Sequence, residues 1–222
     1  MKIIDLSYPI EQHFKFPFQK KIERDYSPTF RCSIHGLGMH TFTHCDSELH
    51  ILPNNRSVSE VPLEQWCGDA SVIDLSKEIQ SNTPVTEELC NQHGQHVKEN
   101  DIVIIRTDWP LKCDWKTKEF WSTAPYIIED ACEWLVDHKV KTVGYDFPND
   151  FIIRDGILNP GKKHTLADYT AHRIMLPKKI LFIENMTNLH LITKNRFLFI
   201  GLPLFITGTG GAPMRCIAIE EL

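Results

Sequence analysis

Three histidines and one aspartate lie close together in the sequence and could hold a metal ion. They are His40, His44, Asp46 and His50, all at even-numbered positions. In an extended strand, residues of equal parity project from one face, so these four side chains share a side of the chain. A straight strand would separate His40 from His44 by roughly 13 Å, whereas metal–ligand bonds measure only about 2.0–2.2 Å. We therefore interpret 40–50 as a bent, extended metal-binding segment, with two ions along it as the alternative.

A catalytic metal centre needs ligands from more than one segment, and two further residues could supply them. Glu184 directly follows the apolar run 180–183, where a carboxylate would begin to leave the core. Buried glutamates are rare unless they are paired or bound to metal. His172 follows Asp168 by four positions, so both project from one face of a helix. The pattern leaves two interpretations open, because 164–172 could equally be a solvated helix face.

Length and composition are those of an ordinary globular chain. The 222 residues fit one domain, 1–222, and the net charge of −5 argues against a general nucleic-acid surface. The first residues lack the apolar stretch of a signal peptide, and the most apolar segment, 197–206, is too short and broken to span a bilayer. Seven scattered cysteines without a C-x-x-C pair indicate reduced thiols. We expect a cytoplasmic protein without a nucleic-acid or membrane partner.

Apolar patterning predicts a mixed α/β fold. Strands are expected at 2–7, 70–75, 101–105, 140–145, 180–183, 197–200 and 217–219. Helices are expected at 59–66, after the N-caps Thr83 and Thr123 (the second over 123–138), and from Thr165 to about Leu176 with Asp168 in a capping box. The segment 11–31 has no helical period, so we expect it either to fold over the domain or to form an arm on a partner subunit.

The segment 40–50 resembles the H-x-G-T-H-x-D-x-P-x-H signature of the metal-dependent cyclase-like hydrolases, which include kynurenine formamidases (arylformamidases) and isatin hydrolases. Shorter matches extend over nearly the whole chain, at 4–7, 9–10, 72–76, 106–109, 144–146, 171–173, 184–186, 201–204 and 211–215. Two positions depart from the signature. Phe42 replaces a glycine that would ease the bend, and Glu48 replaces a proline and adds a negative charge near the site.

The resemblance implies a fold, a metal centre and an assembly. The fold is a single α/β domain of the swivelling β/β/α type, a mixed sheet with flanking helices, in a homodimer or higher homo-oligomer. The centre holds one or two divalent ions, Zn²⁺ or Mn²⁺, and Asp46 bridges them if there are two. Its ligands are His40, His44, Asp46, His172 and Glu184. His50, outside this set, is the general acid/base.

These features lead to a functional expectation with two alternatives. We expect a hydrolase that cleaves an amide, ester or lactone of a small molecule with metal-activated water. Candidate substrate contacts are Phe14, Phe16 and Phe18 as an aromatic wall, and Phe42, which would narrow the pocket. One alternative is hydrolysis of N-formylkynurenine specifically; the other is a binding or storage protein without catalysis. Cys45, on the opposite face from His44 and Asp46, is expected to be a small buried residue.

Overall fold

A single large sheet forms the centre of the molecule. The structure is a computed structural model that describes residues 1–26 and 29–221. In spatial order the strands are β1 (Lys2–Asp5), β12 (Gly211–Glu220), β11 (Arg196–Pro203), β5 (Cys67–Asp74), β7 (Ile102–Arg106), β9 (Thr142–Tyr145), β10 (Leu181–Glu184) and β4 (His44–Asp46). Strand β4 also pairs with β12, so seven strands close into a ring and β1 lies on β12 outside it.

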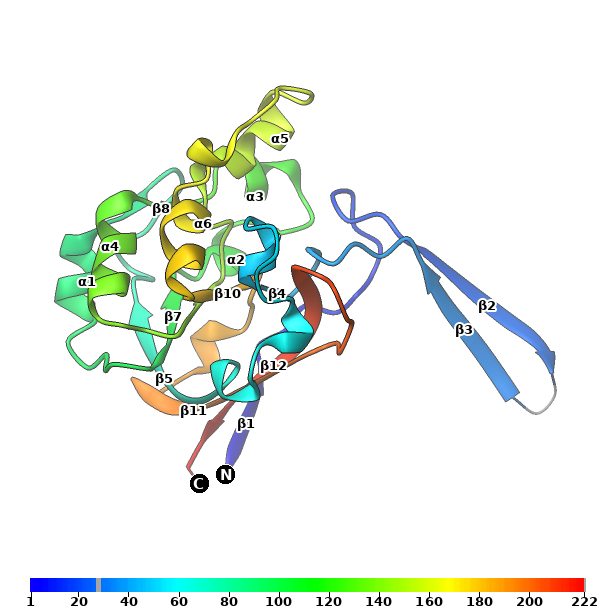
Figure 1. Ribbon diagram of the computed structural model, residues 1–222, viewed down its shortest axis with the longest axis horizontal. Helices are drawn as coiled ribbons and strands as arrows, with labels where there is room; N and C mark the ends of the chain where they lie inside the picture. The colour runs from blue at the N-terminus through cyan, green and yellow to red at the C-terminus, as the bar shows by residue number, and fades with distance from the viewer. Residues whose placement is uncertain (27–28, 222) are drawn as a thin grey trace.

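The four strands β5, β7, β9 and β10 run parallel to one another, whereas the other pairs of the large sheet are antiparallel. As expected for strands covered on both faces, Ile102, Val103, Ile104 and Ile105 are fully buried. Helices α1 (Glu87–His93), α4 (Glu129–Asp137) and α6 (Thr170–Met175) lie beside one another over this parallel part (Figure 1). The predicted mixed α/β fold with flanking helices is confirmed.

Shorter helical turns connect these elements. They are η1 (Glu48–His50), η2 (Val58–Glu60), η3 (Leu63–Gln65), α2 (Trp109–Lys112), α3 (Lys118–Ser122), η4 (Phe151–Arg154), α5 (Asp155–Leu158), η5 (Leu166–Asp168), η6 (Leu176–Lys178) and η7 (Leu189–Leu191). None of the helices in the described part combines the length and the apolar character that crossing a membrane requires.

Two helices begin later than predicted, for one shared reason. Pro84–Val85 forms β6, which pairs in parallel with β8 (Tyr126–Ile127). This pairing uses backbone groups that the first helical turns would otherwise have used, and it joins segments far apart in the sequence. Helix α1 therefore starts at Glu87 and α4 at Glu129, so the predicted N-caps Thr83 and Thr123 were wrong.

Two further helix predictions hold only in part. The capping box of Thr165 and Asp168 is present, but it opens the 3₁₀ turn η5. The backbone then turns at Tyr169, and α6 begins at Thr170. The helix predicted for 59–66 is divided into η2 and η3, because a proline, Pro62, disfavours helical conformation in the residue before it.

The segment after residue 18 leaves the body as a two-stranded ribbon, β2 (Gln19–Tyr26) and β3 (Thr29–His35). Figure 1 shows this ribbon extending away from the closed sheet. The preceding residues, by contrast, pack on the domain, where Phe16 and Phe18 are buried, so the first part of the segment folds over the domain and only the ribbon leaves it. The part of that expectation that concerns residues 27–28 lies outside the described residues. The two chain ends lie side by side, because β1 pairs with β12 (Figure 1).

Candidate metal centre

The centre is built on the pairing of two short strands, β4 and β10. They are antiparallel, and their register places His44 directly opposite Glu184. Directly opposed residues share a face of the sheet, and so does Asp46, two positions after His44. Nε2 of His44 consequently lies 3.6 Å from Oδ1 of Asp46 and 3.6 Å from Oε2 of Glu184. Cys45 points to the other face and is fully buried, as expected.

The predicted bend occurs at Phe42, the position where the signature has glycine. Its φ angle is +55°, in the left-handed region that a residue with a Cβ adopts at some cost. Its carbonyl accepts hydrogen bonds from Nδ1 of His44 and from Nδ2 of Asn185, each at 2.9 Å. The first bond commits Nδ1 of His44 and leaves Nε2 for the centre. The bend thus also sets which nitrogen of His44 is available.

His40 and His50 approach the centre from the two ends of the same segment. Nδ1 of His40 is 2.7 Å from Oδ1 of Asp46, and the rings of His40 and His50 stack with centroids 3.9 Å apart. Two glycines make room for them. A Cβ on Gly211 would overlap the His40 ring, and one on Gly210 would lie 2.6 Å from the backbone nitrogen of His50. The glycines before and in β12 therefore position both histidines.

His172 reaches the same point from α6. Its Nδ1 donates to Oδ2 of Asp150 at 2.6 Å, while its Nε2 lies 3.6 Å from Asp46 and 3.8 Å from Glu184. Asp150 also accepts the backbone N–H of Ala171 at 2.7 Å, which fixes the carboxylate against the start of α6. A carboxylate that holds one imidazole nitrogen and leaves the other free is the usual support of a metal-binding histidine.

Burial and mutual proximity shift the pKa values of these side chains. Burial raises the pKa of Glu184, and the neighbouring Asp46 carboxylate raises it further. Burial also opposes ionisation of Asp46, but the surrounding imidazoles of His44 and His172 hold its pKa well below the usual range. Burial lowers the pKa of His50 to about 4, so its imidazole is neutral near pH 7.

The donors fit a divalent cation. In the described part, two groups of three side chains place ligand atoms within 4.8 Å of one another, and both include Asp46: His40 with His50, and His44 with Glu184. Oε1 of Glu184 is buried and has no hydrogen-bond partner among the described residues, a costly arrangement that a bound ion would relieve. Mixed imidazole and carboxylate donors suit zinc and manganese.

A small cavity of about 140 Å³ opens onto these side chains. All six residues predicted for the centre line it. Of the predicted aromatic contacts, Phe16 lines it, whereas Phe18 and Phe42 lie outside its lining, as does the exposed Phe14. Phe42 is fully buried against Phe16, with ring centroids 5.3 Å apart, so it supports the wall from behind.

Sequence reasoning missed several residues of this site. Lys15, Trp121, Pro148, Ile153 and Tyr169 line the cavity, and Asp150 orients His172. They come from four separate segments, and none has a spacing that relates it to 40–50. One sequence feature pointed to any of these residues: the change from apolar to polar residues after β9, between Tyr145 and Asp150.

The charge expected from Glu48 is balanced. Its side chain is buried and forms an ion pair with Arg56, whose Nε donates to Oε1 at 2.8 Å. Glu48 is not among the described residues that line the cavity. The substitution of glutamate for the signature proline therefore adds a buried ion pair beside the segment rather than an uncompensated charge.

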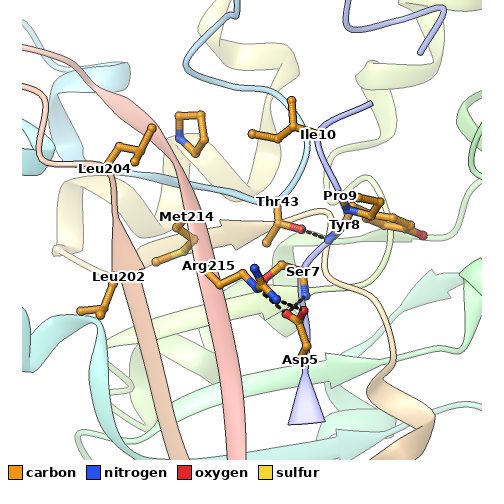
Figure 2. A pocket seen from close by; sticks show the side chains of 11 residues that line it. Asp5, Ser7, Tyr8, Pro9, Ile10, Thr43, Leu202, Leu204, Met214 and Arg215 are labelled. Atoms are coloured by element: carbon orange, nitrogen blue, oxygen red, sulfur yellow. Dashed lines mark hydrogen bonds and ion pairs between the residues drawn. The ribbon is translucent and has the colours of Figure 1, made fainter. Parts of the chain in front are cut away.

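A second hollow, of about 450 Å³, lies beside the segment that carries the site. Figure 2 shows Asp5 and Arg215 joined by two hydrogen bonds on its wall, at 3.0 and 2.6 Å. It also shows the hydroxyl of Thr43 accepting the backbone N–H of Tyr8. None of the candidate ligands is among the described residues that line this hollow. The Thr43–Tyr8 bond anchors the start of β4 to the N-terminal segment, and the Asp5–Arg215 pair joins β1 to β12.

Comparison with known proteins relates the chain to one family of enzymes. Residues 4–149 match the family described as "Putative cyclase". A kynurenine formamidase from Bordetella petrii is 26% identical over 96% of this chain and 88% of its own length. One from Salinibacter ruber is 26% identical over 98% and 97% of the two chains.

Solved structures share the fold. Isatin hydrolase A from Labrenzia aggregata, bound to benzyl benzoate, superposes with a TM-score of 0.79 at 22% identity and covers 98% of this chain and 93% of its own. A protein from Bacillus stearothermophilus described as a predicted metal-dependent hydrolase gives a TM-score of 0.70 at 21% identity, covering 98% and 97%.

Proposed function

We propose that this chain, which belongs to the cyclase family, is a metal-dependent hydrolase that cleaves an amide, ester or lactone bond of a small molecule. The convergence of His44, Asp46 and Glu184 across the β4–β10 pair is the observation that carries the proposal. The names of relatives at 26% identity, kynurenine formamidases, support hydrolysis of an amide C–N bond.

The five proposed ligands are His40, His44, Asp46, His172 and Glu184, and the ion is Zn²⁺ or Mn²⁺. One or two ions would bind here, and Asp46, which belongs to both groups of three closely spaced donors, would be a ligand of each. When bound, a divalent ion polarises the scissile carbonyl and acidifies a water molecule. The protein positions the donors for this: the Phe42 carbonyl and Asp150 each hold one imidazole nitrogen and leave Nε2 free.

His50 is the proposed general acid/base. Its ring lines the cavity and stacks on His40, and the residue is partly exposed to solvent. In this role a ring nitrogen of His50 takes the proton of the attacking water and returns it to the leaving group. Ligand atoms of His50, His40 and Asp46 also lie within 4.8 Å of one another, as they would if His50 bound the ion. The experiment must therefore distinguish a His50 that acts as a general base from one that is a metal ligand.

Metal analysis combined with His50→Ala kinetics makes this separation. The full chain, loaded with zinc or manganese, is assayed on formanilides, lactones and cyclic amides. We expect His50→Ala to lower kcat by about 100-fold or more while the metal content per chain stays unchanged. A wild type that binds no metal would falsify the proposal. Loss of metal in His50→Ala would make His50 a ligand instead, and metal binding without turnover of any substrate favours a non-catalytic binding protein.

Hydrolysis of N-formylkynurenine is the second candidate, because several relatives are named kynurenine formamidases. Including N-formylkynurenine in the same panel decides between the two. If it is the substrate, its kcat/KM exceeds that of formanilide. Equal or lower values assign the chain to another amide or lactone.

We further propose that the chain is a homodimer whose β2–β3 arm packs on the second copy. The ribbon register places Ile22 opposite Cys32 and Lys20 opposite Ile34, so the two isoleucines share one face. Both are about half exposed, at 51% and 47%. A two-stranded ribbon alone is marginally stable in water, and a second copy would cover this face.

Sedimentation velocity tests the arm. We expect wild type to sediment as a dimer, and Ile22→Lys with Ile34→Lys to shift it to monomer with an unchanged circular dichroism spectrum. Gln19→Lys adds charge to the opposite face of the ribbon and is the matched control. A monomeric wild type, or a dimer that survives both changes, contradicts the arm contact.

Two broader assignments complete the proposal. The whole chain, 1–222, is one domain, which the pairing of β1 with β12 supports because it joins the two ends of the chain. The location is cytoplasmic, supported by seven cysteines that are all unpaired.

A further inference from the structure

Lys15 lines the cavity of the metal centre, and the proposed chemistry leaves its charge unused. Of the described residues that line this cavity, Lys15 alone carries an ammonium or guanidinium group. Its side chain is half-buried, and within the described part its Nζ forms no hydrogen bond or ion pair. Burial lowers the pKa of Lys15, whereas its charged neighbour, the carboxylate of the proposed ligand Glu184, raises it. A lysine removed from water normally has a directly bonded charged partner. Glu184 acts on Lys15 only from beyond ion-pair distance, so the ammonium group is free to bind a further anion directly.

The position of Lys15 is fixed by an aromatic cluster. Its Nζ lies 4.8 Å from the ring centroid of Trp121 and 5.7 Å from that of Phe16, both within cation–π range. Its backbone N–H donates to Nδ1 of His13 at 3.1 Å. The His13 ring is in turn stacked between neighbours, 4.3 Å from Trp115, and its Nε2 donates to the Trp115 carbonyl at 3.0 Å. The ammonium group is therefore held over the cavity by rigid groups.

The remaining lining of the cavity contains two kinds of side chain. Six are the histidines and carboxylates of the proposed centre, and Phe16, Trp121 and Ile153 add apolar surface. A volume of about 140 Å³ is close to that of a cavity that admits a single benzene ring. A substrate with its scissile carbonyl at the centre and a small ring against Phe16 and Trp121 would place ring substituents near Lys15, whose Nζ lies over these two rings.

We propose that Lys15 is a specificity residue that binds a carboxylate on the substrate, so that the enzyme prefers small cyclic or aryl amides and lactones that carry an acid group. This inference rests on the proposed hydrolase function and adds the charge of the substrate. An ammonium–carboxylate contact in a half-buried site is stronger than one at the surface, because water competes less for both groups.

Paired substrates test the assignment. Formanilide is compared with 2-, 3- and 4-formamidobenzoate on metal-loaded wild type, Lys15→Met, Lys15→Arg and Lys178→Met. The quantity measured is the ratio of kcat/KM for the best carboxylate substrate to kcat/KM for formanilide. We expect Lys15→Met to lower this ratio by about tenfold or more, and Lys15→Arg to keep most of it. Lys178 is exposed and outside the cavity lining, so Lys178→Met removes the same charge without changing the ratio.

A ratio that changes by less than about threefold in Lys15→Met overturns the proposal, as does an equal loss on all four substrates. Binding provides a readout that does not need turnover. Calorimetric titration of the metal-loaded proteins with benzoate and benzamide should show a Kd for benzoate raised about tenfold in Lys15→Met, relative to benzamide. If no substrate is turned over but this binding difference is found, the hydrolase proposal fails and the carboxylate site stands. An unchanged Kd overturns the site.

Discussion

Asp150 accepts the Nδ1 proton of His172 at 2.6 Å and so determines which nitrogen of that imidazole faces the metal centre. The opposite nitrogen, Nε2, lies between Asp46 and Glu184. Asp150 is itself fixed by the backbone N–H of Ala171. The orientation of His172 thus depends on Asp150, a residue outside the proposed ligand set.

Asp150→Asn should weaken metal binding, because an amide can donate to Nδ1 and favour the wrong tautomer. Loss of such a supporting carboxylate lowers metal affinity by about 10–100-fold. Competition with a chelating indicator measures the affinity of the full chain. Asp155→Asn is the control, since Asp155 pairs with Lys162 and is not among the described residues that line the cavity. Equal affinities in the two variants would show that His172 needs no support from Asp150.

Gly211→Ala should displace His40. The added Cβ would overlap the His40 ring and lie 2.9 Å from the carbonyl oxygen of Cys45. We expect a lower free energy of unfolding and a loss of activity of more than about tenfold, because His40 can no longer approach Asp46. Gly156→Ala is the control, since nothing lies within 4 Å of a Cβ at that position.

A double-mutant cycle tests the cause of that loss. If the His40 ring is the obstacle, most of the stability cost of Gly211→Ala disappears in a His40→Ala background. Additive costs would place the strain in the β4–β12 backbone pairing instead.

Phe42→Gly sets two opposing effects against each other. Glycine relieves the left-handed backbone at Phe42, which is a gain of about 1–2 kcal/mol. It also removes a fully buried ring that packs on Phe16 and Trp115, and such truncations cost about 3–5 kcal/mol. The loss of packing should exceed the relief of backbone strain, so we expect the variant to be about 1–4 kcal/mol less stable by urea unfolding. A variant as stable as wild type would mean that the backbone strain at Phe42 equals the value of its packing.

Glu220 should make stability depend on pH in the acid range. Burial alone would raise its pKa, but the backbone N–H groups of Thr193 and Lys194, the Thr193 hydroxyl and Lys2 outweigh burial and lower it to about 2. The unfolded value is about 4.3. The carboxylate therefore contributes stability above about pH 4.3, and this contribution is lost as the pH falls toward 2.

Glu220→Gln should consequently be about 1–3 kcal/mol less stable than wild type at pH 7, with the difference closing below about pH 4. Urea unfolding at a series of pH values measures this. Glu133→Gln changes an exposed glutamate on α4 and should show no such pH dependence. A difference that stays constant from pH 7 to pH 2 would show that the hydrogen bonds do not depend on the charge of Glu220.

Local sequence pattern predicted the elements that depend on neighbouring residues. The apolar runs of β7 and β10 are strands, and the helical period of 129–137 is α4. The starts of α1 and α4 were wrong, because β6 and β8 pair across about forty residues of sequence, a contact that no local pattern contains.

The sequence by itself determined that His44 and Asp46 share a face and that Cys45 does not, because alternation along a strand follows from covalent geometry. It also indicated that the segment must bend, since a straight strand cannot bring His40 to a common point. Only the tertiary structure decided what meets them there. The register of β4 on β10 brings Glu184 opposite His44, and the cavity brings Lys15 from a separate segment. Strand register and cavity lining depend on contacts between distant residues, and these contacts determine which of the proposed ligands meet and which charged side chain lies beside them.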